Sequence, residues 1–269
     1  MDQKKVFQYA STANIDANLY HDILAHEDKV EKICIVILIV LIYVFRGWIG
    51  YWLNFGVAIP SGIDMTPINV SGNPIQTDYT NDEKVRKTFT YKSLINDHKM
   101  EIIPQAHYVL PGVAVAYNHD FLFISEFFDS AALYDLGTSW GKLADKETFK
   151  KYIKVYSQKV EMTGSRRLNW TWKPDTPFDG YYINSHISHS HLIPANKNIM
   201  SALLKIKVWD KVEIEGELVD MKYKKPGHPF PIEYHTSLSR TDIDSSSRGS
   251  GACETVYVTK VRIGNVVYK

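Results

Sequence analysis

Three histidines at positions 186, 189 and 191 form the densest group of potential metal ligands in the chain. Imidazole is the commonest metal-binding side chain near neutral pH. Side chains alternate along a strand, so His189 and His191 would share one face while His186 points the other way. Two imidazoles can begin a zinc site, but further ligands must come from elsewhere. The nearest further donors that we consider are His235, Glu233 and Asp220.

The sequence motifs of common metal sites do not accompany these histidines, because the chain has no HExxH and no paired CxxC. The simpler interpretation is that the histidines hydrogen-bond locally on a strand or lie at the surface. The alternative hypothesis is a metal site at His189 and His191, which requires the two side chains to converge with a third ligand.

A second group of reactive residue types lies near the C-terminus and comprises Ser237, Ser239, Arg240, Asp242, Cys253 and Glu254. An Arg with carboxylates nearby can pin a loop through charge-assisted hydrogen bonds. Cys253 beside Glu254, with His235 on a neighbouring strand, is the one arrangement that resembles a nucleophile with its base. No glycine elbow accompanies it, so pinning of the loop from 240 to 254 is the favoured interpretation.

A third group is electrostatic, because residues 142–173 contain nine basic residues against three acidic ones. A solvated helix face is the simplest explanation, and binding of acidic lipid headgroups, cell-wall polymer or a partner subunit is the alternative. Trp170 and Trp172 alternate on one strand face, where they either pack in the core or form a stacking platform. The candidate binding residues are Lys150, Lys151, Lys154, Arg166, Arg167, Trp170, Trp172, Arg240 and Asp242.

Strands must position most of these residues. Alternating or β-branched and aromatic patterns predict strands at residues 107–117, 168–172, 180–193, 211–223, 232–238 and 254–263. Helical stripes predict two helices, at 146–159 with Asp145 as N-cap and at 194–206. A helix followed by strands around residues 205–220 suggests a small curled sheet of the OB or related barrel type.

A hydrophobic segment precedes this domain. Residues 33–45 are thirteen consecutive apolar residues, and only Arg46 interrupts their continuation to Leu53. A helix of these 21 residues is roughly 31 Å long and matches the hydrocarbon core of a bilayer. Trp48, Tyr51 and Trp52 suit an interfacial aromatic belt. We favour an uncleaved anchor over a buried core helix, or over a signal peptide cleaved near Ala58.

The anchor divides the chain into a tail (1–32), a transmembrane helix (33–53), a spacer rich in Pro, Gly and Ser (54–83) and a β-rich domain (84–269). Lys29 and Lys32 precede the span, and no Lys or Arg lies between Gly47 and Glu83. The positive-inside bias therefore predicts a cytoplasmic N-terminus and a domain outside. In total we expect an α+β chain with one transmembrane helix and two or more helices in the domain.

Composition excludes several classes of protein. The chain has 269 residues, 31 Lys and Arg against 30 Asp and Glu, 45% hydrophobic residues and two cysteines. These values argue against disorder, a multi-span membrane protein and a disulfide-stapled miniprotein. The near-neutral charge argues against a dedicated nucleic-acid binder. Without a P-loop or a dinucleotide-binding glycine fingerprint, no cofactor is expected.

Five segments in order carry a family resemblance: AHYVLPGVAVAYN, ALYDLGTSWGKL, SHSHLIPAN, the stretch from GELVDM to SLSRTD, and GACETVYV. Together they cover most of the chain from about residue 105 to 258 and resemble uncharacterised single-pass bacterial envelope proteins. In that family pattern a tight acidic-glycine turn follows Arg-Thr-Asp, whereas here a longer stretch, DIDSSSRGSGACE, does. The resemblance implies a domain on the periplasmic side of the inner membrane and brings no established activity.

These observations favour a membrane-anchored binding or assembly module over an enzyme. A subunit of an envelope or secretion complex is one concrete form, by analogy of topology alone. Its expected partners are membrane lipid and other envelope proteins or further copies of itself, with no nucleic acid. The alternative is an anchored hydrolase that acts on an envelope substrate through the histidine cluster or the Cys253 loop.

Overall fold

The computed structural model describes residues 30, 32–38, 55–79, 87–95, 98–118, 131–159, 166–224, 230–238 and 253–269. The chain divides into two compact units, Met1–Gly50 and Tyr51–Lys269. In the first unit residues 32–38 are helical, and the aliphatic side chains from Ile33 to Leu38 are exposed. Within the described ranges no helix has the length and apolar character needed to cross a bilayer. Residues 39–53 of the expected span lie outside those ranges, so the span stays a prediction.

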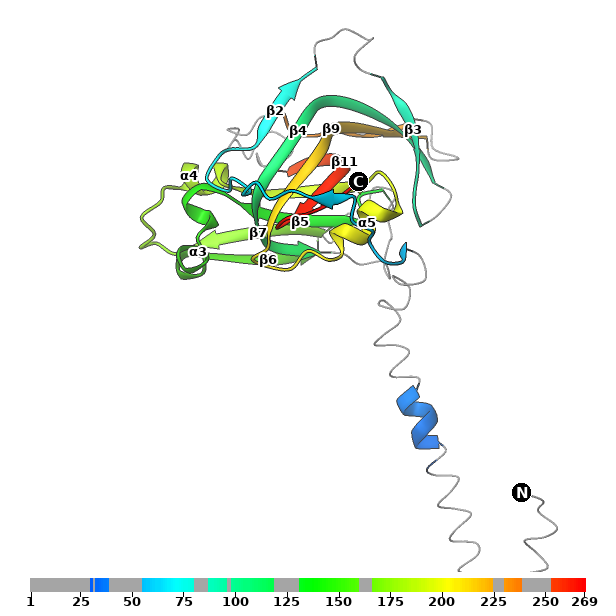
Figure 1. Ribbon diagram of the computed structural model, residues 1–269, viewed down its shortest axis with the longest axis horizontal. Coiled ribbons are helices and arrows are strands. Elements are labelled where there is room, and N and C mark those ends of the chain that lie inside the picture. Colours follow the sequence, from blue (N-terminus) through cyan, green and yellow to red (C-terminus); the bar gives the residue numbers. More distant parts are fainter. Residues whose placement is uncertain are drawn as a thin grey trace, which may run out of the picture. The chain divides into compact units, whose positions relative to one another are not determined.

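The second unit is a mixed α+β domain in which strands predominate (Figure 1). Its strands are β1 (Gly62–Ile63), β2 (Ile75–Asp78), β3 (Phe89–Lys92), β4 (Lys99–Asn118), β5 (Tyr134–Ser139), β6 (Ile153–Lys159), β7 (Arg166–Trp172), β8 (Ile187–Pro194), β9 (Lys211–Tyr223), β10 (Ile232–Tyr234), β11 (Cys253–Ile263) and β12 (Val266–Tyr268). Its helices are the 3₁₀ turn η1 (Gly141–Ala144), α3 (Lys146–Tyr152), α4 (Gly180–Ser185) and α5 (Lys197–Leu203).

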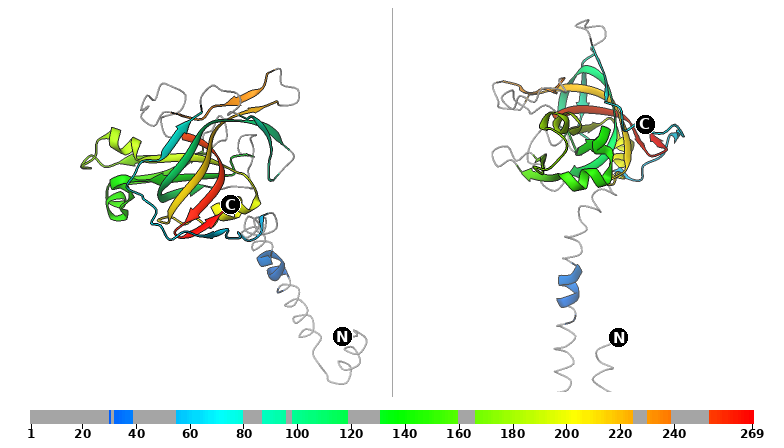
Figure 2. Two further views of the ribbon diagram at one scale, coloured as in Figure 1. Left: turned by 45° about the horizontal axis from the view of Figure 1, so that its top comes forward. Right: turned by 90° about the vertical axis from the view of Figure 1, so that its left-hand side faces the viewer.

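One sheet organises the domain, with the strand order β1-β12-β11-β8-β5-β4-β9-β10. Strand β9 also pairs with β11, so the sheet curls back on itself (Figure 2). The pairing of β8 with β11 is parallel, and the chain between β8 and β9 contains α5. Gly216 of β9 allows the close approach of β11, because an added Cβ would collide with the carbonyl oxygen of Tyr257.

Among the described residues, three buried hydrophobic clusters hold the domain together. The largest is lined by β4, β9 and β11 and by α5, with Leu110, Ile214 and Val258 among its members. A second contains Ile193 with residues of β3, β4 and β9, and a third contains Ile187 with residues of α3 and α4. Strand β8 therefore runs from one cluster to another, with Ile187 and Ile193 near its two ends.

Tertiary pairing changes two predicted elements. The helix expected at 146–159 ends at Tyr152, because residues 153–159 form β6 and pair with β7, although Asp145 does cap the helix by accepting from the backbone N–H of Thr148 at 2.8 Å. The strand expected at 180–193 begins instead with α4, and only residues 187–194 are strand. Strand β5, which sequence reasoning did not identify, lies between β4 and β8.

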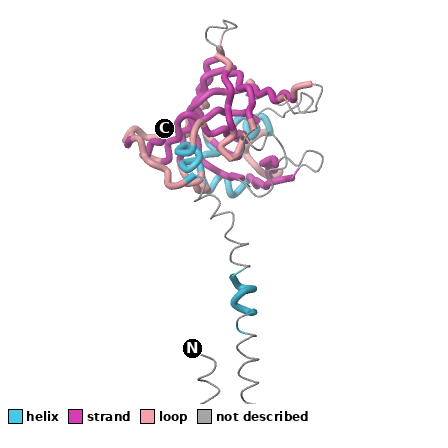
Figure 3. The backbone as a smooth tube through the Cα atoms, turned by 90° about the vertical axis from the view of Figure 1, so that its right-hand side faces the viewer, coloured by secondary structure: helices cyan, strands magenta, loops and turns pink. Residues whose placement is uncertain are grey.

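Residues 55–73, here called the strap, differ from the spacer that the composition predicted. The backbone of Ile59 donates to the side chain of Asn198 at 2.7 Å and accepts from it at 3.0 Å. Strand β1 pairs with β12, and the buried Arg262 donates to the carboxylate of Asp64 at 2.9 Å. The strap is therefore fixed along one side of the domain beside the C-terminal strand (Figure 2). Strands make up the largest share of the described backbone of this domain (Figure 3).

Candidate metal centre

Strands β5 and β8 place three potential ligands on one face. The antiparallel register pairs Asp135 with His191 and Gly137 with His189. Because side chains at i and i+2 on a strand share a face, His189 and His191 both lie on the side where Asp135 projects. The alternation inferred from sequence is thus realised on β8, and the neighbouring strand supplies the carboxylate.

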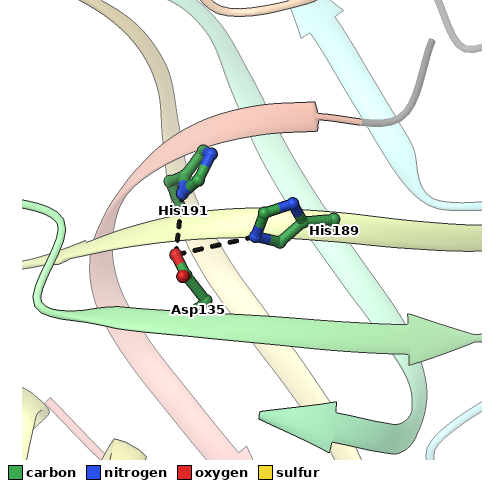
Figure 4. Close-up of side chains that lie close together, drawn as sticks. All are labelled: Asp135, His189 and His191. Atoms are coloured by element: carbon green, nitrogen blue, oxygen red, sulfur yellow. Dashed lines mark hydrogen bonds and ion pairs between the residues drawn. The ribbon is translucent and has the colours of Figure 1, made fainter. Parts of the chain in front are cut away.

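The three side chains converge on one oxygen atom (Figure 4). His191 Nδ1 lies 2.7 Å from Asp135 Oδ1, and His189 Nε2 lies 3.6 Å from the same oxygen. The two imidazole rings stand edge to face with their centroids 4.4 Å apart. One donor atom from each residue lies within 4.8 Å of the other two.

The carboxylate of Asp135 is ionised despite its burial. Its side chain is 13% exposed, and those of His189 and His191 are 4% and 12% exposed. Burial acts to raise the pKa of Asp135, but the charge of His191 and the hydrogen bonds from both histidines outweigh it and lower the pKa to about 2. Asp135 therefore carries a negative charge at neutral pH, which pairs with a protonated imidazole or with a bound cation.

The histidine pair on β8 lies between apolar clusters on its own face of the strand, and a separate polar group lies on the opposite face. On the same face of β8, Ile187 and Ile193 extend into apolar clusters. On the opposite face Ser190 lies 3.3 Å from the buried carboxylate of Glu254, which also lies 3.4 Å from the hydroxyl of Tyr108. Strand β8 is thus buried on both faces. The imidazoles of His189 and His191 lie on one face, and the hydroxyl of Ser190 lies on the other.

The geometry fits a small transition-metal ion. Two imidazole nitrogens and a carboxylate oxygen suit zinc and its neighbours rather than magnesium or calcium. Donors on a tetrahedral zinc ion with bonds of about 2.1 Å stand roughly 3.4 Å apart. The separation between His189 and Asp135 is 3.6 Å, close to that value, and the 2.7 Å hydrogen bond of His191 would open by a fraction of an ångström.

The third histidine of the sequence cluster takes no part. His186 follows α4 and stacks on Tyr182, with the ring centroids 3.8 Å apart. Its Nδ1 lies 2.9 Å from the carbonyl oxygen of Tyr182. It therefore fits the local hydrogen-bonding role that sequence analysis favoured for all three histidines.

The further donors suggested by sequence form a separate group, with Asp220 on β9, Glu233 on β10 and His235 just after β10. His235 Nδ1 lies 3.2 Å from Asp220, and its Nε2 lies 3.7 Å from Glu233. The side chain of His235 is 66% exposed, so this group lies at the surface. The candidate donor missed by sequence is Asp135, the one acid within the otherwise uncharged segment ALYDLGTSW, and an acid inside such a strand was the available signal.

The Cys253 loop is described only at its two ends. Residues 239–252, which include Arg240 and Asp242, lie outside the described residues, as does the side chain of Cys253. The backbone of Cys253 pairs with that of His189. Before the loop, the side chain of Thr236 accepts from the backbone N–H of Thr255 at 3.0 Å. Both ends are thus attached to the sheet, and the pinning of the loop from 240 to 254 by Arg240 and its neighbouring carboxylates stays a prediction.

The basic residues of 142–173 are spread over several elements. The ammonium group of Lys150 lies 5.6 Å from the ring centre of Trp209, and that of Lys151 lies 4.9 Å from that of Tyr152. Lys154 is exposed on β6. The side chains of Arg166 and Arg167 lie outside the described residues.

Trp170 and Trp172 share one face of the β6-β7 hairpin. The indole N–H of Trp170 donates to Asn184 at 3.0 Å, and its ring packs against the cluster that contains Ile187. Trp172 is 41% exposed and lies against Gly180. Of the two tryptophans, Trp172 is therefore the one with a large exposed aromatic surface.

No protein-family model, curated protein or solved structure matches the chain. The resemblance to bacterial envelope proteins therefore stays an expectation drawn from the five sequence segments. Asp135, His189 and His191 are the described residues whose donor atoms gather closely enough to hold a metal ion.

Proposed function

We propose that this chain is a membrane-anchored extracytoplasmic module that binds a divalent transition-metal ion through Asp135, His189 and His191. The observation that carries the proposal is the convergence of three metal-binding side chains from two strands in a buried site. A histidine that only hydrogen-bonded locally would not need a second imidazole directed at the same carboxylate oxygen. Zinc is the ion that best suits two imidazoles and one carboxylate.

Binding is favoured over catalysis by the burial of the site. Hydrolytic zinc centres keep one coordination position open to water and substrate, whereas structural or storage sites are closed. The three side chains are between 4% and 13% exposed. An anchored hydrolase stays the second candidate, because two imidazoles and one carboxylate are also a donor set of hydrolytic zinc enzymes.

The wider setting of the proposal is the bacterial inner membrane, with the domain on the periplasmic side. The 33–53 segment and the lysines before it support this placement. We also propose an OB-like, partly open barrel for the curled sheet. The pairing of β9 with both β4 and β11, and the position of α5 between β8 and β9, support that proposal.

The experiment is a measurement of zinc content in the full chain, purified in detergent and stripped with a chelator. After dialysis against zinc, elemental analysis should find one ion per wild-type chain. Asp135→Asn and His191→Ala should lose the ion, because each removes a donor. His235→Ala is the matched control, since it removes an exposed histidine that also contacts carboxylates. Equal zinc content in all four proteins would reject the site.

Assembly with other envelope proteins or with further copies of the chain is a separate question. Co-purification from detergent addresses it directly, because an assembly subunit should carry partners through size-exclusion chromatography. If the chain always elutes as a monomer without partners, the hypothesis that it is an assembly subunit is rejected. Metal binding then stays as its proposed role.

A further inference from the structure

The strap presents a row of aliphatic side chains to solvent. Val57, Ile59, Ile63 and Met65 are 59%, 71%, 74% and 73% exposed. All four occupy odd-numbered positions, whereas Ala58 between the first two is buried. Pro60, Ser61 and Gly62, between Ile59 and Ile63, are exposed as well, so most side chains from Val57 to Met65 face outward. The large side chains of this exposed segment are apolar, and we call these four residues the aliphatic row.

The row is held in place by its backbone. The N–H of Ser61 donates to the carbonyl of Val267 at 2.8 Å, and that of Asp64 donates to the carbonyl of Asn265 at 2.9 Å. Arg262, which is 3% exposed, fixes Asp64 from beneath. Exposure of the row is therefore a property of the fold. Adjacent exposed apolar side chains of this size mark an interaction surface.

Lysines accompany the aliphatic row. The ammonium group of Lys205 lies 3.5 Å from the carbonyl oxygen of Ala58 in the strap. The side chain of Asn198, next to Lys197, donates to the backbone of Ile59 and to the carbonyl of Lys269. Lys197, Lys205 and Lys269 are all exposed. Apolar side chains beside lysines are the composition of surfaces that lie on anionic bilayers.

We propose that the aliphatic row rests on the surface of the lipid bilayer in which the chain is anchored. This inference rests on the proposed anchor at residues 33–53. Val57 follows Leu53 by four residues, so it lies within about 14 Å of the end of the span along the chain. The polar interfacial layer of a bilayer extends roughly 5 to 8 Å beyond its hydrocarbon core. The first residues of the row are therefore within reach of that layer, and a lipid surface is the occupant that chain connectivity supplies.

The test uses the full chain in vesicles of phosphatidylethanolamine and phosphatidylglycerol. A photo-crosslinking residue replaces the exposed side chain in the variant Ile63→p-benzoylphenylalanine. The matched control is Ile75→p-benzoylphenylalanine, because Ile75 is 61% exposed on β2, a strand that pairs with β4 rather than β12. Mass spectrometry should find several-fold more lipid adduct at position 63 than at position 75. The excess should shrink in phosphatidylcholine vesicles, where the lysines lose their anionic partners.

Each other outcome overturns the proposal. Equal lipid adducts at both positions, or none at either, would mean that the row does not touch the bilayer. An adduct with a second copy of the chain would identify the row as a contact between copies. Alkaline extraction of the same vesicles reports on the anchor separately: a chain that stays in the membrane without a lipid adduct at position 63 fails this inference alone, whereas a chain that is released fails the anchor.

Discussion

Strand β8 and the strap depart from the usual distribution of side chains in opposite directions. On β8, two imidazoles and the carboxylate that faces them are between 4% and 13% exposed. On the strap, four aliphatic side chains are between 59% and 74% exposed. A buried polar group and an exposed apolar surface are the informative exceptions in a folded protein.

The two regions differ in what could offset the free-energy cost of a buried polar group or of an exposed apolar surface. Polar groups in the interior cost free energy unless hydrogen bonds or ions satisfy them. The β8 cluster is satisfied in part from within the chain, through the 2.7 Å contact between His191 and Asp135. The side chains of the aliphatic row face outward, so hydrogen bonds or ions inside the chain cannot offset their exposure. The comparison therefore indicates an ion for the first region and an external surface for the second.

The largest expected effect on the free energy of unfolding comes from truncating Ile187 on β8, and the matched truncation on the strap is that of Ile63. Ile187 is 1% exposed and packs in the hydrophobic cluster at the α4 end of β8, two residues from His189. Ile187→Ala should lower the free energy of unfolding by about 3 kcal/mol, through lost burial and the cavity left behind. Urea unfolding of the full chain in detergent, followed by tryptophan fluorescence, measures it. A loss below about 1 kcal/mol would mean that this end of β8 is loosely packed.

Zinc should stabilise the domain by a slightly smaller amount. An ion that binds only the folded chain adds about 2.7 kcal/mol when its free concentration is 100 times the Kd. For a domain of this size the thermal midpoint should rise by roughly 5 to 10 °C. The shift should disappear with chelator and in Asp135→Asn, and it should persist in His235→Ala. A shift of equal size in Asp135→Asn would place the ion elsewhere.

The attachment of the strap should contribute somewhat less. Arg262 donates to the carboxylate and backbone carbonyl of Asp64 and to the carbonyls of Thr66 and Gly264. Arg262→Met keeps the aliphatic bulk but removes these charge-assisted bonds, so it should cost about 2 kcal/mol. It should also expose the strap to limited proteolysis. Unchanged stability and unchanged cleavage would show that β1 holds the strap without Arg262.

The smallest effect completes the comparison. Ile63→Ala removes the same side-chain type as Ile187→Ala, but at a position that is 74% exposed. Its free energy of unfolding should stay within about 0.5 kcal/mol of wild type in detergent. A loss near that of Ile187→Ala would mean that Ile63 packs inside the protein, which would remove the basis of the aliphatic row.

Sequence patterns predicted much of this architecture because strand alternation is a local property. The strand expected at 211–223 coincides with β9, and that at 254–263 matches β11 to one residue. Alternation also placed His189 and His191 on one face, which the structure confirms. Local signals failed where long-range pairing decides. Residues 153–159 have a helical stripe, yet pairing with β7 draws them into a hairpin.

The third ligand could not be found by sequence proximity. Asp135 precedes His191 by 56 residues and meets it only because β5 and β8 are neighbours in the sheet. His235, Glu233 and Asp220 were the nearest further donors along the chain, but the strands that lie beside β8 are β11 and β5. The strap was missed for a related reason. Its Pro, Gly and Ser content suggested a spacer, while side chains such as Asn198 and Arg262 satisfy its backbone.

The most direct test of the account is a calorimetric zinc titration of the metal-free full chain beside Asp135→Asn. The account predicts one zinc ion per wild-type chain and a loss of affinity greater than about 100-fold in the variant, since removal of even an outer-shell partner can cost that much. It also predicts that His235→Ala titrates like wild type. No zinc uptake by the wild-type chain, or the same binding curve for wild type and Asp135→Asn, would contradict it.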